Sequence, residues 1–211
     1  MKSEFWPPFS KPTNIKKTRH ENVIAYKEAF FEEDTSSLCL VMEYADAGDL
    51  QQRIEALKRT GGLMSEKEIW HVAIKVLRAL ASLHKLKIVH RDIKAANIFL
   101  CREEGIDSLN VKLGDLNVSK IAKLGLMKTQ TGTPYYASPE VWRDQPYDYK
   151  CDIWSLGCVL YELAALRPPF MAKDMNGLFQ KVTRGVFANI PPRYSGDLYY
   201  LISRMLTVDP A

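Results

Sequence analysis

The chain has 211 residues, of which 46% are hydrophobic and 26% are charged, and its formal net charge is +4. This composition is ordinary for a soluble globular protein of one domain, or of one domain and part of another, and it excludes collagen-like, disulfide-dense and wholly disordered chains. The basic residues are dispersed, which favours a normally solvated surface over one that binds nucleic acid.

The first 46 residues predict an arm followed by a small β unit. Residues 1–19 contain three prolines, several lysines and little hydrophobic periodicity, which indicates an irregular arm. Residues 23–31 and 37–44 are apolar and aromatic around a polar turn, which predicts two strands. The strands and the segment that follows them form a second unit, residues 20–46.

The clearest helix is predicted over residues 65–86. Ser65 and Glu68 fit a capping box, and apolar residues then recur at helical spacing. Residues 98–100 and 111–113 predict two short strands around a polar loop.

The last third of the chain predicts three more helices. Asp152 is expected to N-cap a helix that reaches about residue 165, and this segment is apolar on nearly all sides. Such a helix should lie buried at the centre of a helical body. Weaker amphipathic patterns predict helices near 174–183 and 196–207. We expect this mainly helical unit to cover residues 47–211.

Cysteine usage and hydropathy bear on the compartment. No two cysteines form a C-x-x-C pair, which indicates reduced thiols in a cytoplasmic protein. No apolar run approaches the roughly 18 residues of a membrane span, and the N-terminus has no apolar signal-peptide core. We therefore expect a cytoplasmic protein that binds neither nucleic acid nor membrane. The cysteines are Cys39, Cys101, Cys151 and Cys158.

Five motifs follow one another along the chain. They are V-M-E-Y-A-D-A-G-D-L (41–50), H-R-D-I-K-A-A-N (90–97), L-G-D-L-N (113–117), G-T-P-Y-Y-A-S-P-E (132–140) and D-I-W-S-L-G (152–157).

In this order the five motifs resemble those of eukaryotic protein kinases over about residues 20–211, and they are most similar to the NIMA-related serine/threonine kinases. The resemblance implies an α+β protein-kinase-like fold. Its β N-lobe would be truncated to the strands and hinge at 20–46, and its C-lobe at 47–211 would be mainly α-helical and incomplete at the C-terminus.

The resemblance also implies roles in phosphoryl transfer from ATP to a serine or threonine hydroxyl of a protein substrate. Asp92 would orient that hydroxyl and accept its proton, and Lys94 would neutralise the transferring phosphate. Asn97 and Asp115 would supply the oxygen ligands that Mg²⁺ prefers. Thr133 would help to shape the substrate site.

The nucleotide base is expected against the hinge. By resemblance, Met42 is the gatekeeper, and Glu43 and Ala45 offer backbone hydrogen bonds. Asp49 would meet the ribose and Phe99 would pack below the adenine. Met42 and Phe99 would be core residues with or without a nucleotide.

A regulatory site is expected beside the catalytic loop. In the family, an arginine at the position of Arg91 pairs with a phosphate on the activation segment. Thr129 and Thr131 are the candidate acceptors, and Thr129 fits the NIMA-related pattern better. The alternative is that both are unmodified loop threonines.

The sequence departs from the kinase pattern in its first third. A kinase needs a glycine-rich loop and a strand lysine paired with a helix glutamate, but the first glycine here is Gly48, already past the hinge. The V-A-I-K at 72–75 lies inside the predicted helix, where Lys75 falls on the polar face. The segment 115–117 reads D-L-N instead of D-F-G, which keeps the aspartate and is expected to be tolerated.

Three interpretations remain open. The chain is the catalytic region of a serine/threonine kinase, a pseudokinase-like module that binds a protein partner at an exposed sheet edge, or a partial product of a longer kinase. In the second case, Phe5, Trp6 and Phe9 are candidates to cover that edge. The resemblance also admits cytoskeletal or ciliary association of the cytoplasmic protein.

Overall fold

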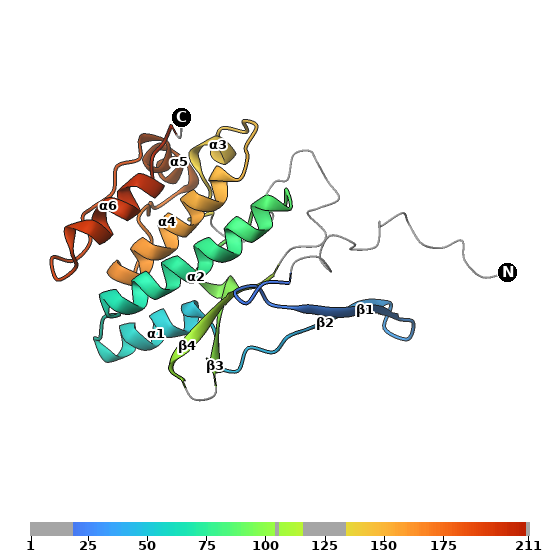
Figure 1. Cartoon of the computed structure of the whole chain (residues 1–211). Coiled ribbons are helices and arrows are strands. Elements are labelled where there is room, and N and C mark those ends of the chain that lie inside the picture. Colours follow the sequence, from blue (N-terminus) through green and yellow to red (C-terminus); the bar gives the residue numbers. More distant parts are fainter. Residues whose placement is uncertain (1–18, 104–105, 116–133, 210–211) are drawn as a thin grey trace.

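A computed structural model of the chain describes residues 19–103, 106–115 and 134–209, and it shows a β-hairpin that reaches away from a helical body (Figure 1). Its fold is the expected α+β type. The elements in chain order are β1 (Tyr26–Glu32), β2 (Ser37–Met42), α1 (Leu50–Thr60), α2 (Glu66–Lys85), the 3-10 helix η2 (Ala95–Asn97), β3 (Ile98–Glu103), β4 (Ile106–Leu113), α3 (Pro139–Trp142), α4 (Lys150–Ala165), α5 (Met175–Arg184) and α6 (Gly196–Met205).

The strands form two separate antiparallel sheets of two strands each, β1–β2 and β3–β4. The prediction that the first strand begins at residue 23 is wrong, because Val23 makes a parallel bridge with Leu113 and the Ile24 N–H donates to the Leu113 carbonyl at 2.9 Å. These residues therefore tie the base of the hairpin to β4. A second isolated bridge joins Asp49 to Phe99 of β3.

Local capping explains where the first two helices begin. The sequence reasoning missed α1, although Asp49 caps it by accepting a hydrogen bond from the Gln52 N–H at 2.9 Å and Gly61 ends it in the left-handed conformation, with φ 66°. The capping box predicted for α2 is confirmed: Ser65 and Glu68 each accept a hydrogen bond from the other's backbone N–H.

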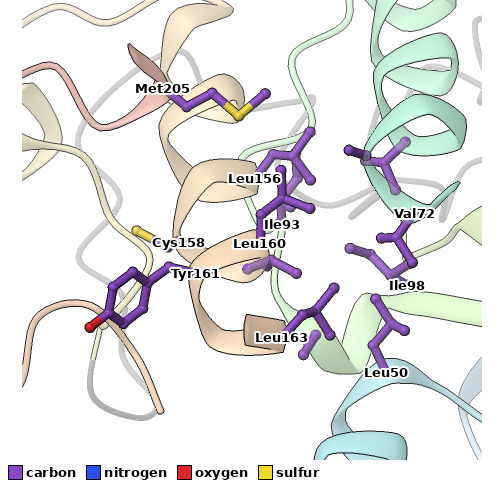
Figure 2. Close-up of a cluster of buried hydrophobic side chains, with 14 of the residues drawn as sticks. Leu50, Val72, Ile93, Ile98, Leu156, Cys158, Leu160, Tyr161, Leu163 and Met205 are labelled. Atoms are coloured by element: carbon purple, nitrogen blue, oxygen red, sulfur yellow. The ribbon is translucent and has the colours of Figure 1, made fainter. Parts of the chain in front are cut away.

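Helix α4 lies at the centre of the body, as predicted, and most of its residues are buried. Figure 2 shows Leu156, Leu160 and Leu163 of α4 pointing toward Ile93 and Val72, which come from the loop after α2 and from α2 itself. The predicted N-cap is wrong. The helix begins at Lys150, and Asp152 lies inside its first turn, where it is fully buried.

Helices α5 and α6 confirm the two weaker patterns, and α6 is fixed to the start of α2. Ser195 caps α6 and also hydrogen bonds to the Glu66 carboxylate through both its N–H, at 2.8 Å, and its hydroxyl. The Tyr194 hydroxyl donates to the Met64 carbonyl at 2.8 Å. Across the described ranges, no helix has the length and hydropathy needed to cross a membrane.

Candidate active site

The loop at residues 90–97 connects α2 to β3 and is held by one buried carboxylate. Asp152 accepts hydrogen bonds from the His90 N–H and the Arg91 N–H, each at 2.9 Å. It also lies 2.8 Å from Nε2 of His84 at the end of α2. Arg91 has a φ of 67°, which costs a non-glycine residue conformational energy. Asp152 therefore holds the loop in a strained turn immediately before Asp92.

His90 links this loop to the segment that carries Asp115. Its Nδ1 faces the Asp92 N–H at 3.3 Å, and its Nε2 lies 2.9 Å from the Gly114 carbonyl. These partners require a proton on Nε2 and a free lone pair on Nδ1. Burial lowers the pKa of His90, so the ring stays neutral at pH 7 and keeps both contacts.

The structure brings three of the predicted catalytic side chains together. Lys94 Nζ lies 3.2 Å from Asp92 Oδ2. The Asn97 side-chain N–H groups donate to the Asp92 carbonyl at 2.8 Å and to Asp92 Oδ2 at 3.2 Å. One carboxylate oxygen of Asp92 therefore has two donors, and within the described ranges no hydrogen bond occupies the other. That oxygen is free to accept a proton from a hydroxyl.

Asp115 lies next to this group at the end of β4. The Gly114 N–H donates to the Asn97 carbonyl at 3.0 Å, and Asp115 is exposed with a φ of 54°. A Cβ at Gly114 would lie only 2.6 Å from the Phe99 ring, so a glycine is required for this close approach.

The donor set fits a magnesium ion. Asp115 has two carboxylate oxygens, and the side-chain oxygen of Asn97 has no hydrogen-bond donor among the described residues. Mg²⁺ is commonly held by one or two such ligands together with substrate phosphates. The two predicted ligands are an aspartate and an asparagine, and the described part of the chain has no cluster of three or more His, Cys, Asp or Glu residues.

The two hinge residues Met42 and Glu43 differ in their exposure and in their contacts. Met42 is 47% exposed, so the expectation of a core residue is wrong: the described residues place no second layer over it. Glu43 is anchored, with its carboxylate 2.6 Å from Lys112 Nζ and its N–H bonded to the Ala25 carbonyl at 2.8 Å. Its carbonyl is therefore the group left for a ligand.

The other three residues of the predicted base site come from the segment between β2 and α1 and from β3, which Asp49 and Phe99 join through a bridge. Ala45 is half-buried in the extended segment between β2 and α1. Asp49 uses one carboxylate oxygen to cap α1, and Phe99 is half-buried against Gly114. That these residues bind a nucleotide base stays a prediction, and Met42, the predicted gatekeeper, is exposed to solvent.

The predicted regulatory arginine has an unsatisfied polar group. Arg91 Nε is buried and has no hydrogen-bond partner among the described residues, and the guanidinium carbon lies 5.5 Å from the centre of the Tyr147 ring. Thr129, Thr131 and Thr133 lie outside the described residues, so their relation to Arg91 and Asp92 stays a prediction. Leu116 and Asn117 also lie outside them.

Two buried acidic side chains of α4, Asp152 and Glu162, were missed by the sequence reasoning as functional supports. Glu162 in α4 is 3% exposed and accepts a hydrogen bond from the Tyr136 hydroxyl at 2.6 Å. Burial raises the pKa of Glu162. Ser155, one turn after Asp152, donates to the Tyr136 carbonyl at 2.8 Å. The signal was present, because acidic residues inside an apolar helix need a partner.

A cavity formed by described residues lies away from these side chains. It has a volume of about 750 Å³ and is lined by Glu140, Tyr147 and Val208, among others. None of the catalytic candidates lines it. The described residues place no ion pair on Glu140.

Comparison with known proteins gives a consistent result. The protein kinase domain family matches residues 13–211. Human serine/threonine-protein kinase Nek5 is 40% identical over 198 residues, which are 93% of this chain and 27% of that protein. Mouse serine/threonine-protein kinase Nek1 is 42% identical over 194 residues, 91% of this chain and 15% of that protein.

A relative from an amoeba is also a serine/threonine-protein kinase by its name. The probable serine/threonine-protein kinase nek2 of Dictyostelium discoideum is 38% identical over 200 residues, 93% of this chain and 47% of that protein. The chain therefore spans less than half the length of each of these curated relatives.

Proposed function

The chain belongs to the protein kinase domain family, and from this membership we propose that it is the catalytic region of a serine/threonine protein kinase. The reaction would move the γ-phosphoryl group of ATP to a serine or threonine hydroxyl of a protein substrate. The observation that carries this proposal is the side-chain group of Asp92, Lys94 and Asn97, with distances of 3.2 Å from Asp92 Oδ2 to each nitrogen.

Each side chain of this group has a task that its geometry supports. Asn97 fixes the Asp92 carboxylate, so that its free oxygen orients the substrate hydroxyl and accepts the proton. Lys94 provides a positive charge beside that carboxylate, where charge on the phosphoryl group must be neutralised. Asn97 and Asp115 would hold Mg²⁺, which when bound neutralises charge on the phosphates.

The nucleotide and the substrate are proposed to use the neighbouring segments. The Glu43 carbonyl and the Ala45 N–H would bind the base between Met42 and Phe99, and Asp49 would meet the ribose. Thr133 is proposed to shape the substrate site. Arg91 is proposed to bind a phosphate on Thr129 or Thr131, and this is supported by its buried Nε, for which the described residues offer no hydrogen-bond partner.

A second candidate function is favoured by what precedes the hinge. Within the 211 residues, no glycine occurs before Gly48. Lys75 lies in α2 rather than on a strand. A module with these features would bind a protein partner without binding the phosphates of ATP. A protein partner at the exposed edge of the hairpin and a cytoplasmic location stay predictions.

Phosphotransfer and nucleotide binding, measured separately, test the proposal. Purified chain should transfer phosphate from ATP to a serine- or threonine-containing protein, and Asp92→Asn should lower kcat by about 10²–10⁴-fold. The matched variant Asp34→Asn, at the exposed hairpin turn, should retain full activity.

Calorimetry with Mg-ATP separates the two candidate functions. The kinase proposal predicts binding in both the unmodified chain and Asp92→Asn, because Asp92 acts on the hydroxyl and not on the nucleotide. A folded chain that neither binds Mg-ATP nor transfers phosphate would contradict the proposal and support the binding module.

A further inference from the structure

The β1–β2 hairpin presents apolar side chains on both of its faces. Phe30, Phe31 and Leu40 are 49%, 50% and 40% exposed. The strand register places Phe31 and Leu40 on one face and Phe30, opposite Cys39, on the other. No third strand pairs with this sheet in the described ranges, and the hairpin extends away from the helices (Figure 1).

The hairpin is also acidic. Between residues 26 and 42 there are four acidic residues and one lysine, which gives a net charge of −3. All five side chains are exposed, and no ion pair occupies any of them in the part of the chain that the structure describes. The residues are Lys27, Glu28, Glu32, Glu33 and Asp34. An occupant of this surface should therefore be both apolar and basic.

One segment of the same chain has this chemistry. Residues 1–18 contain four lysines and one glutamate, a net charge of +3, together with Phe5, Trp6 and Phe9. We propose that residues 1–18 dock on the β1–β2 hairpin in cis, with the aromatic side chains against its apolar faces and the lysines beside its carboxylates.

The anchoring of the chain permits this contact. Val23 and Ile24 are tied to Leu113 at the base of the hairpin, so the segment joins the body directly beside β1. Eighteen residues span up to roughly 60 Å when extended, whereas a strand of seven residues is about 23 Å long.

The charge argues against a second copy as the occupant. Two hairpins that each carry −3 would repel on approach. Attachment through the same chain also gives residues 1–18 an effective concentration on the order of millimolar at the hairpin. The cis contact would compete with any protein partner at the sheet edge, and it does not depend on the proposed phosphotransfer.

Hydrogen exchange of the peptide amides in residues 26–42 tests the proposal. The triple variant Phe5→Ser, Trp6→Ser, Phe9→Ser should increase the exchange rate of these amides at least tenfold. Exchange in α4 should stay unchanged and serves as the internal measure of folding. Reversal of charge in Glu32→Lys, Glu33→Lys should have the same effect, because it removes the electrostatic part of the contact.

The control variant is Tyr200→Ser, which removes an aromatic side chain that is 66% exposed on the helical body. It should leave exchange in residues 26–42 unchanged. A synthetic peptide of residues 1–18, added to a chain that lacks them, should restore the protection.

Two outcomes would overturn the proposal. Equal exchange of residues 26–42 in the unmodified chain and the triple Ser variant would show that the hairpin is not covered by this segment. Protection that grows with protein concentration, with a dimer detected by light scattering, would assign the surface to a second copy.

Discussion

The hairpin and the helical body both contain large apolar side chains, but those of the body are buried and those of the hairpin are exposed. Leu156 and Leu160 in α4 are fully buried between layers of helix and strand, whereas Phe30 and Leu40 in the hairpin are about half exposed. The difference lies in the number of layers. A two-stranded sheet has no second layer to cover it, so the apolar content of a segment does not by itself place that segment in a core.

The same division separates two parts of the proposed chemistry. The body fixes Asp92, Lys94 and Asn97 through buried supports, while the hairpin leaves Met42 exposed at the nucleotide-base site. The proposed positioning of a substrate hydroxyl would therefore rest on the buried helical body, and the proposed contact with the base would rest on the exposed hairpin.

Removal of the buried Asp152 carboxylate should give the largest difference between the two regions in the free energy of unfolding. Asp152→Ala leaves the His90 and Arg91 N–H groups without their acceptor and releases a strained turn, so the free energy of unfolding should fall by about 3–5 kcal/mol. Urea denaturation measures this change. Asp34→Ala in the hairpin turn should alter it by less than about 0.5 kcal/mol, and equal effects would contradict the assigned role of Asp152.

Truncation of one leucine in each region is the next most sensitive comparison. Leu160→Ala should destabilise the fold by about 2–5 kcal/mol because it opens a cavity beside α4. In a chain that carries Phe5→Ser, Trp6→Ser and Phe9→Ser, Leu40→Ala should change the free energy of unfolding by less than about 1 kcal/mol, since its side chain is 40% exposed. A larger loss for Leu40→Ala in the unmodified chain than in this variant would agree with the proposed docking of residues 1–18 on the hairpin.

The smallest expected effect concerns pH. Because the pKa of Glu162 is raised on folding, the folded state binds more protons than the unfolded state above about pH 4.5, and stability falls as pH rises through the raised pKa. Glu162→Gln keeps an acceptor for Tyr136 without the buried charge. It should therefore increase the free energy of unfolding at pH 7 by about 1 kcal/mol, with no gain at pH 4.

Thermal unfolding at the two pH values checks this prediction. Glu28→Gln, an exposed carboxylate on β1, should show no such dependence on pH. If Glu162→Gln destabilised the protein more at pH 7 than at pH 4, the charge would be stabilising and the prediction wrong.

Strong local signals made much of the body predictable. The capping box at Ser65 and Glu68 and the nearly uniform apolarity after Asp152 located α2 and α4. Helix α1 was missed although Asp49 and Gly61 cap it, because its apolar residues are few and its polar face is wide. Strand boundaries were less accurate, since Val23 pairs with a strand that is distant in sequence.

The site residues were nominated by motif, whereas acidic residues inside the apolar helix α4 indicated only that buried supports exist and not which groups they bind. Asp152 was predicted to cap a helix, and only the tertiary structure places it against the His90 and Arg91 amides, 62 and 61 residues earlier in the chain. The exposure of Met42 likewise depends on which elements lie nearby. A linear pattern reports residue types and does not report what packs against them.

The contact between Ser195 and Glu66 has a consequence for how the protein is made. The two residues are 129 positions apart, so on the ribosome the start of α2 is synthesised well before the residue that completes its polar network. At about 5–20 residues per second, this interval is on the order of ten seconds. Until residues 150–165 have been synthesised, the apolar stripe of α2 has neither α4 nor α6 to pack against. Nascent chains of this length are therefore natural clients for chaperones that bind exposed apolar helices.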